Sequence, residues 1–600
     1  MNSLRQRITT SAVRIFAAIG VLTTLLAVLV IFSVIHAEYA TPSEPDSVVL
    51  VLNFDQPIIE KSESSPLDFA IHEESTPLLD ILHAIDRARG DPHAKGLVAR
   101  FGGRQPSLAQ AEEIRAALAR FRTSGKFTYA FGSTYGDFGS GNRAYFIASG
   151  FENIWLQPVG AVSLTNIAIE APFGRAALEK IGVHGDFMRR EEYKSFSETF
   201  MRDDFSPPVR ANMQAMVDDF ATQIAEGIAE GRKWNVARVR QLMAKGPYTA
   251  SEALKEGLVT HIAHAEDLEE ELKKKAGNDV ELASVDEYLA YRGEGGKSKP
   301  KARVALIYGT GLIMDHAEGG ASDVTGEDMM GADKIAGAFD DAADNKKIKA
   351  IIFRVDSPGG SPEASETIRA ALMHAQKVGK PVFVSMGGVA ASGGYWVAMN
   401  ADQIIAEPGT ITGSIGVLAG KFVIGGLMQK LGINWDSLSS GKNGDLWAMT
   451  KEYTPEQRER INAFLDETYR TFTESVASAR KIPPVKMPEV AKGRVWTGAQ
   501  AAKIGLVDQL GGYDVTLGAV RKKLGLKPDD MLAIEQFPPP LSPAEKVLKI
   551  LKGIGIESAM IRTALVQWQH LQALAGVVWD GEGLSPVVAR VPFAIQRVVK

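Results

Sequence analysis

Two glycine-rich turns carry the side chains best suited to nucleophilic chemistry. Residues 356–360 (DSPGG) and 391–396 (ASGGYW) each follow an apolar run and precede a helical pattern. Each pattern predicts a strand that turns directly into a helix, where small residues let a ligand approach and helix N-terminal amides point outward. A serine in such a turn is exposed beside donors that suit an oxyanion. Ser392 is therefore a candidate nucleophile, although either turn alone is also a routine connector in α/β folds.

The chain repeats itself internally, so its two halves can be compared column by column. Residues 114–118 and 368–372 share the sequence IRAAL, 254 positions apart, and Pro158 matches Pro408 at an offset of 250. Self-similarity over such a distance predicts two tandem domains of one fold.

The two halves differ in a complementary way at the columns that could do chemistry. At the offset of 250, Ser392 falls opposite Asn142, and Lys194 falls opposite Gly444. Each half keeps what the other lacks, as expected if both complete one site. A serine needs a base within hydrogen-bond reach, and a lysine serves only when burial keeps it neutral. Lys194 is the predicted base, and Lys442, two positions from the matched column, remains the alternative.

The apolar setting that Lys194 needs has candidates in its own neighbourhood. Tyr193, Phe196 and Phe200 would exclude water from the amine, whereas Arg189 and Glu192 bring charge close to it. We expect the aromatic residues to lower the pKa of the lysine by burying it.

Strand-like and helix-like patterns alternate through both halves. Val/Ile-rich runs, such as residues 48–54, alternate with helical patterns, such as residues 112–121 and 366–377. This alternation predicts βαβ units and a mostly parallel sheet covered by helices. Residues 455–482 predict one long helix, with an apolar stripe formed by Asn462, Phe464, Leu465, Tyr469, Phe472 and Val476.

The N-terminal segment has the pattern of a membrane anchor. Residues 15–35 form a run of 21 residues without a charge, after Arg5, Arg7 and Arg14 and before several acidic residues. The run is long enough to span a bilayer, and the flanking charges place the N-terminus in the cytoplasm. The alternative is a signal peptide removed after Ala37.

Composition excludes several other classes of function. The balance of 67 basic and 72 acidic residues gives no electrostatic case for a nucleic-acid partner. The absence of cysteine excludes disulfides and thiol nucleophiles, and the ten histidines show no metal-ligand spacing. We expect neither a metal nor a cofactor. The amphipathic segment from residue 536 onward predicts packing or an oligomer contact, with a membrane-surface role as the alternative.

Four motifs together resemble the signal peptide peptidase A (protease IV) family of serine peptidases. They are DSPGGS (356–361), SMGGVAASGGYW (385–396), GTITGSIGV (409–417) and GRVWTGAQAAKIGLVDQLGG (493–512). The repeat layout, the anchor and residues 192–207 match the long tandem form, and the resemblance covers most of residues 46–535. The family implies a crotonase/Clp-protease-like fold and hydrolysis of remnant signal peptides in the membrane.

The resemblance also implies roles for individual residues. It implies Ser392 as the nucleophile, Lys194 as the general base, Gly360, helped by Gly359, and Gly393 as the oxyanion hole, and Ser414 as a lysine-orienting residue. It implies peptide substrates, a lipid bilayer and a homotetramer as partners. Whether Lys194 meets Ser392 within one chain or between chains stays open.

These observations predict an α/β protein with two tandem crotonase/Clp-protease-like repeats after one transmembrane helix. The expected divisions are 1–45 (anchor), 46–291 (the repeat supplying the lysine), 292–302 (linker), 303–535 (the repeat supplying the serine) and 536–600 (extension). The expected function is a serine endopeptidase of a bacterial inner membrane, with periplasmic domains that degrade cleaved signal peptides. The alternatives are a crotonase-like acyl-CoA enzyme and a non-catalytic membrane scaffold.

Overall fold

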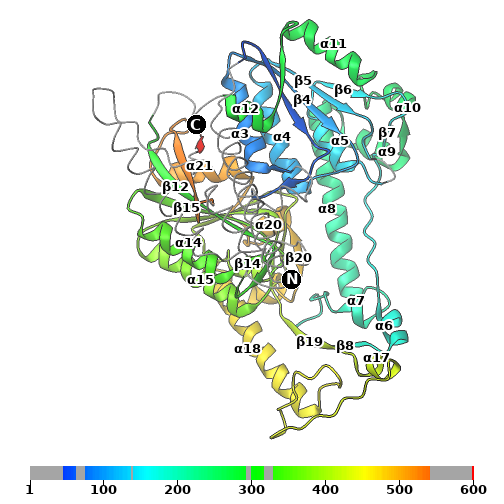
Figure 1. Ribbon diagram of the computed structural model, residues 1–600, viewed down its shortest axis with the longest axis vertical. Coiled ribbons are helices and arrows are strands. Elements are labelled where there is room, and N and C mark those ends of the chain that lie inside the picture. Colours follow the sequence, from blue (N-terminus) through cyan, green and yellow to red (C-terminus); the bar gives the residue numbers. More distant parts are fainter. Residues whose placement is uncertain are drawn as a thin grey trace, which may run out of the picture.

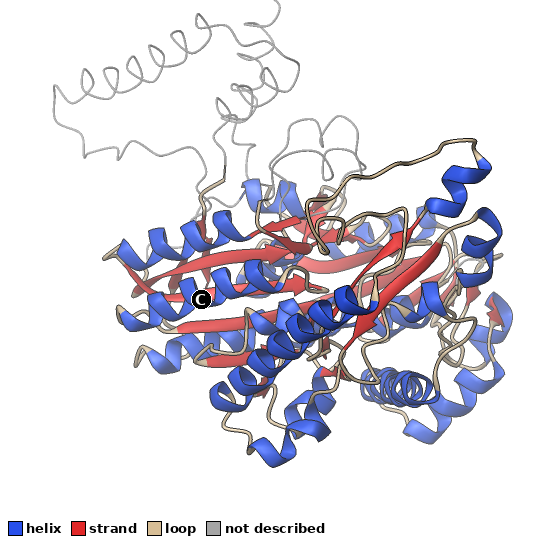
Figure 2. Cartoon of the chain, turned by 90° about the horizontal axis from the view of Figure 1, so that it is seen from below, coloured by secondary structure: helices blue, strands red, loops and turns tan. Residues whose placement is uncertain are grey.

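Two β-sheets, one from each half of the chain, form the framework of this computed structural model (Figures 1 and 2). The structure describes residues 45–61, 75–136, 139–291, 299–316, 329–540 and 597–599. The expected anchor and nearly all of the C-terminal extension lie outside these ranges. Within the described ranges, no helix has the length and apolar character needed to cross a membrane.

The sheet of the N-terminal half is parallel throughout. Its strands, in spatial order, are β10 (His261–Ile262), β6 (Asn153–Leu156), β5 (Phe127–Gly132), β4 (Ala94–Phe101), β1 (Val48–Asn53) and β11 (Glu281–Ser284). Short pairs lie outside it: β2 (Ile58–Ile59) with β3 (Thr76–Pro77), and β7 (Ala161–Val162) with β9 (Tyr248–Thr249). Its helices are α3 (Leu78–Gly90), α4 (Leu108–Arg122), α5 (Asn142–Ala148), α6 (Arg175–Ile181), α7 (Glu198–Met201), α8 (Pro207–Arg232), α9 (Val236–Lys245), α10 (Ala250–Lys255), α11 (Ala265–Ala276) and α12 (Val285–Tyr291).

The sheet of the C-terminal half is parallel except at its two ends. Its strands, in spatial order, are β20 (Val495–Thr497), β18 (Ile411–Gly413), β16 (Val382–Ala391), β15 (Ile348–Ser357), β12 (Ala302–Thr310), β22 (Leu532–Phe537) and β23 (Arg597–Val599). β17 (Gln403–Ala406) also pairs with β16 and with β21 (Gln509–Leu510), and β13 (Leu312–Met314) pairs with β14 (Met329–Gly331). The helices are α14 (Ala332–Asp344), α15 (Pro362–Lys377), α16 (Gly393–Trp396), α17 (Gly425–Lys430), α18 (Pro455–Ala479), the 3₁₀ turn η1 (Pro484–Lys486), α19 (Met487–Val490), α20 (Gly498–Lys503) and α21 (Tyr513–Lys523).

The order of elements is the same in the two halves. β1–α3–β4–α4–β5–α5–β6 corresponds to β12–α14–β15–α15–β16–α16–β17. The corresponding helices α4 and α15 begin after Ser107 and Ser361, whose hydroxyls accept from the third helical amide at matched positions. The α/β class and the mostly parallel sheets predicted from the alternating patterns are confirmed.

One hydrophobic core runs from the N-terminal half into the C-terminal half. The cluster that contains Val48, Leu97 and Ile114 also contains Leu306, on β12, and Tyr513, which opens α21. Because the halves share buried apolar surface, each covers part of the other's sheet, and elements from both can meet at one site.

An antiparallel ribbon extends from the two halves into a projecting arm (Figure 1). β8 (His184–Arg189) pairs with β19 (Leu418–Val423) over six residue pairs, from His184↔Val423 to Arg189↔Leu418. β8 leads towards Lys194, and β19 follows Ser414 closely in sequence. The ribbon therefore aligns two loops that come from different halves of the chain.

The long helix α18 differs from its prediction in two details. It ends at Ala479 instead of residue 482, and Lys481 just beyond it adopts a left-handed φ of 54°. Phe464, assigned to the apolar stripe, is 52 % exposed, while Leu465 and Phe472 are buried. The prediction was wrong at Phe464 because that side chain lies beside the buried face and not on it.

Candidate active site

Ser392 occupies the turn between β16 and α16, in a backbone conformation that L-residues rarely adopt. Its φ is 56° and its ψ is −119°. Its amide donates to the Gly413 carbonyl at 2.9 Å, and its carbonyl accepts from Tyr395 and Trp396 in α16. Such a conformation costs about 1–3 kcal/mol and persists only where surrounding contacts enforce it, as at many active sites.

Lys194 reaches Ser392 from the other half of the same chain. Its Nζ lies 2.8 Å from Ser392 Oγ, 3.0 Å from Ser414 Oγ and 3.1 Å from the Ser414 carbonyl oxygen. The residue is 8 % exposed, and burial lowers the pKa of its amine to about 7. Near neutral pH, a large share of the amine is therefore unprotonated and able to accept a proton from the serine hydroxyl.

Glycines of the C-terminal half pack closely against the side chain and the backbone of Lys194. A Cβ on Gly416 would stand 3.3 Å from Lys194 Cδ, and a Cβ on Gly493 would stand 2.5 Å from the Lys194 amide nitrogen. Phe196 is 64 % exposed, so it does not bury the lysine as expected. Phe200 packs instead against Phe422 of the arm.

Ser414 holds the lysine by two contacts at once. Its φ is 51°, and its amide donates to the Arg494 carbonyl at 2.8 Å. This left-handed turn directs both its hydroxyl and its carbonyl oxygen to Lys194 Nζ. Two fixed acceptors leave the amine little freedom except to face Ser392.

The three glycines predicted for an oxyanion hole lie against one another beside Ser392. A Cβ on Gly359 (φ 106°) would stand 2.8 Å from Ser392 Cβ, and one on Gly393 would stand 3.0 Å from the Gly360 amide nitrogen. The Gly359 amide already donates to Ser357 Oγ at 3.1 Å. Within the described part of the chain, no acceptor is assigned to the amides of Gly360 and Gly393. These two amides are therefore the better donors for an oxyanion, and Gly359 provides the close approach.

The N-terminal half fills its own corresponding turn with a side chain. Arg143 and Gln105 stand opposite Gly393 and Gly359 at the offsets of 250 and 254. Gln105 Oε1 accepts from the Arg143 amide at 3.2 Å, and its Nε2 donates to the Ser140 carbonyl. Asn142, opposite Ser392, accepts from the Thr165 amide at 2.9 Å. This half therefore lacks a serine at the matched position, and its matched amide, that of Arg143, already donates to Gln105. The sequence comparison missed this second difference.

The alternative base, Lys442, lies elsewhere. It occupies an exposed loop between α17 and α18, and its carbonyl accepts from Gln457 Nε2. The lysine that contacts Ser392 Oγ is Lys194.

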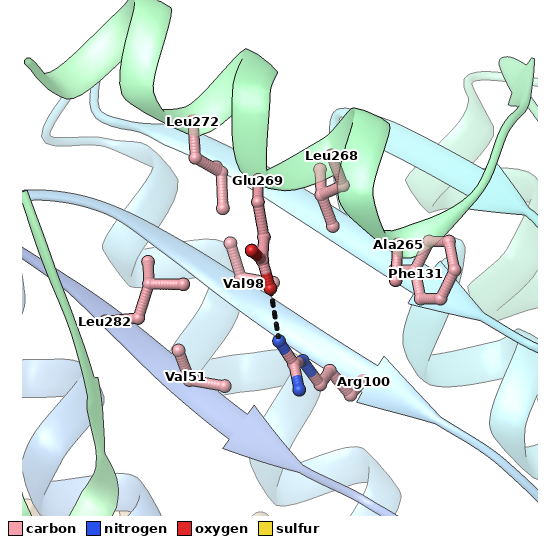
Figure 3. Close-up of a pocket in the computed structure, with 9 residues that line it drawn as sticks. All are labelled: Val51, Val98, Arg100, Phe131, Ala265, Leu268, Glu269, Leu272 and Leu282. Atoms are coloured by element: carbon pink, nitrogen blue, oxygen red, sulfur yellow. Dashed lines mark ion pairs between the residues drawn. The ribbon is translucent and has the colours of Figure 1, made fainter. Parts of the chain in front are cut away.

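Two further features of the described residues lie apart from Ser392 and Lys194. They contain no cluster of His, Asp or Glu able to hold a metal ion. A small apolar cavity of about 80 Å³ lies between α11 and the N-terminal sheet, lined by residues such as Val98 and Leu268, with the Arg100–Glu269 ion pair (3.7 Å) at one side (Figure 3). None of the predicted site residues lines it.

The lowered pKa of Lys194 predicts the pH dependence of any reaction that uses it as a base. The reactive form is the neutral amine, so kcat/KM should rise about tenfold per pH unit below pH 7 and level off above it. Initial rates of peptide cleavage between pH 5 and 9.5 would measure this rise in kcat/KM and the pH at which it levels off. A kcat/KM that keeps rising to pH 9.5, as expected for a lysine with the ordinary pKa of 10.5, would contradict the inferred effect of burial.

A family model and several curated relatives match this chain over much of its length. The model of peptidase family S49 matches residues 121–279 and 374–527. Protease 4 of Salmonella typhi is 34 % identical over 76 % of this chain and 73 % of its own length. Protease 4 of Haemophilus influenzae is 31 % identical over 82 % of this chain and 80 % of its own. The chloroplastic serine protease SPPA of Arabidopsis thaliana is 29 % identical over 78 % and 68 %, respectively.

Proposed function

Because this chain belongs to peptidase family S49 and is a serine peptidase of the protease 4/SppA type, we propose that Ser392 and Lys194 form its catalytic pair. The observation that carries the proposal is the 2.8 Å approach of a buried lysine amine to the hydroxyl of a strained serine. A serine hydroxyl is a weak nucleophile until a base takes its proton, and no other lysine amine is found at that hydroxyl among the described residues.

The reaction proceeds by acyl transfer to the serine. Neutral Lys194 accepts the Ser392 proton while Oγ bonds to the peptide carbonyl carbon, and the carbonyl oxygen gains the electron pair. The amides of Gly360 and Gly393 donate to this oxyanion, and each such donor contributes on the order of 10²–10³ in rate. As the C–N bond breaks, the Lys194 ammonium gives its proton to the leaving amine. Water then attacks the ester, with the same amine as base, and frees the acid and Ser392.

The two halves supply different parts of the site. The division supported by the element order is residues 46–291 as the lysine-bearing repeat and residues 303–535 as the serine-bearing repeat, both of the crotonase/Clp-protease-like type. Ser414 orients the lysine, and Gly359 closes the oxyanion loop against the serine. The pair forms within one chain, aligned by the β8–β19 ribbon.

The substrate class is an extended, apolar peptide such as a cleaved signal peptide. This assignment rests on the resemblance to signal peptide peptidases and on the uncharged run at residues 15–35, which would anchor the enzyme in the membrane that such peptides enter. The protein then sits in a bacterial inner membrane with its catalytic halves on the periplasmic side, and it assembles as a homotetramer.

The proposal is tested by labelling the full-length enzyme in detergent with a fluorophosphonate and mapping the modified residue by peptide mass spectrometry. We expect modification at Ser392, loss of activity in proportion to labelling, and internal cleavage of an unstructured apolar peptide. Labelling at another serine would refute the assignment of the nucleophile. Turnover of an acyl-CoA thioester without peptide cleavage would favour a crotonase-like enzyme, and failure of both label and cleavage would favour a non-catalytic scaffold.

A further inference from the structure

The ladder between β15 and β16 is interrupted just before the two strands deliver the active-site turns. Pairing runs from Ile351↔Val382 to Val355↔Met386 and resumes at Ser357↔Ala390. Across the interruption, Asp356 on β15 faces three residues of β16, namely residues 387–389. Two extra residues on one strand make a bulge, a device that re-aims side chains beside active sites.

The Asp356 carboxylate fills this bulge. Asp356 Oδ1 accepts from the Val389 amide at 2.8 Å. A Cβ on Gly387 would stand 3.0 Å from Asp356 Cβ and 3.2 Å from Oδ1. The Asp356 side chain thus accepts from an amide that lies at the interruption of the β15–β16 ladder, and the absence of a side chain on Gly387 leaves room for the carboxylate.

The bulge determines how the nucleophile meets its partners. Beyond it, Ala391 pairs with Gly413, and the Ser392 amide donates to the Gly413 carbonyl. On the facing strand, Ser357 lies next to Asp356 and accepts from the Gly359 amide. A slip of one residue in β16 would turn its side chains to the opposite face of the sheet. Asp356 therefore binds β16 at the point where the strand register determines how Ser392 lies relative to the loop of Gly359 and Gly360.

We propose that Asp356 is a positioning residue for the peptidase reaction, which holds the β16 bulge so that Ser392 faces Lys194 and the amides of Gly360 and Gly393. It acts through the backbone amide of Val389 and touches no reacting atom. The inference rests on the roles proposed above for Ser392, Lys194 and the two amides.

The same strand offers a matched control at its other end. Asp402 Oδ2 accepts from the Val382 amide at 2.9 Å, at the first residue of β16. Both aspartates therefore hold a backbone amide of one strand, but only Asp356 does so at the bulge. A purely structural role predicts similar consequences when either is removed.

The experiment compares Asp356→Ala, Asp356→Asn and Asp402→Ala in the full-length enzyme, with kcat and KM on an apolar fluorogenic peptide and the rate of fluorophosphonate labelling. Asp356→Ala is expected to lower kcat and the labelling rate by about 10²-fold, the effect of a misplacement near 1 Å, with KM nearly unchanged. Asp356→Asn keeps an acceptor oxygen and should recover most of the loss. Asp402→Ala should keep the wild-type kcat even if its melting temperature falls.

Several outcomes would overturn the inference. One is a wild-type kcat in Asp356→Ala. Another is a loss of kcat in both Asp356→Ala and Asp402→Ala that is proportional to the loss of melting temperature in each variant. If Asp356→Ala does not fold, Gly387→Ala is the variant that tests the proposal, because its methyl group would press on Asp356 from the partner strand. A lowered kcat in the folded Gly387→Ala variant supports the proposal, and an unchanged kcat refutes it. Absence of labelling and cleavage in the wild type would instead refute the proposed function itself.

Discussion

Lys194→Ala and Ser392→Ala are each expected to lower kcat on an apolar peptide by roughly 10⁶-fold, as happens when one member of a nucleophile–base unit is removed. Without the amine, the Ser392 proton has no acceptor at 2.8 Å, and without the hydroxyl the amine has no nucleophile to activate. Because the two groups act together, the double variant should lose no more than either single variant. Steady-state kinetics of the three proteins at pH 8 would measure this.

The matched control is Lys442→Ala, which removes the lysine that sequence comparison left as the alternative base. Its loop is exposed, so we expect wild-type kcat and KM. A silent Lys194→Ala together with an inactive Lys442→Ala would show that the wrong lysine has been assigned. Losses that add in the double variant would show that Lys194 and Ser392 do not work as one unit.

Much of this site could be predicted because the two repeats of the chain can be compared with each other. The contrast between Ser392 and Asn142, and between Lys194 and Gly444, needs only aligned columns of the two halves. The structure brings Lys194 and Ser392 together although 198 positions separate them. The aligned columns could not reveal which residues of the C-terminal half pack against Lys194. Gly493 approaches the lysine through tertiary packing between the halves, and no local pattern near Lys194 encodes that contact.

The parallel sheets could also be predicted, whereas the contacts between the halves could not. Alternating apolar and helical patterns are local, so they indicated β1 and the helices α4 and α15 directly. Arg354 shows the limit of such patterns. It closes an apolar run in sequence, where a charged residue usually marks the solvent-exposed end of a strand, yet its side chain is fully buried.

Arg354 joins the two halves through charges that are withdrawn from water. From β15 of the C-terminal half, its Nε donates to Glu60 at 2.8 Å, one Nη donates to Glu113 on α4 at 2.6 Å, and the other donates to Ser385 at 2.9 Å. The guanidinium also lies 4.7 Å from the centre of the Tyr513 ring. The glutamates belong to the N-terminal half, so this one side chain forms ion pairs with two buried carboxylates across the contact between the halves.

Arg354→Met is therefore expected to destabilise the protein by about 3–5 kcal/mol, because it leaves Glu60 and Glu113 buried without a cation. For halves of this size, that loss lowers the melting temperature by on the order of 10 °C. Thermal unfolding of the full-length protein in detergent, followed by circular dichroism, would measure it. The matched control is Arg470→Ala on α18, whose ion pairs with Glu467 and Glu474 are exposed and should contribute no measurable shift.

The pH dependence of the Arg354→Met defect separates lost charge pairing from lost packing. Burial already raises the pKa of Glu113, and removal of the guanidinium would raise it further. A carboxyl whose pKa is higher in the folded than in the unfolded state binds more protons when folded, so stability increases as the pH falls. The deficit of the variant should therefore shrink from pH 8 to pH 5, and adding Glu60→Gln and Glu113→Gln should remove most of that pH dependence. A deficit that is constant with pH would mean that Arg354 stabilises the contact by packing alone.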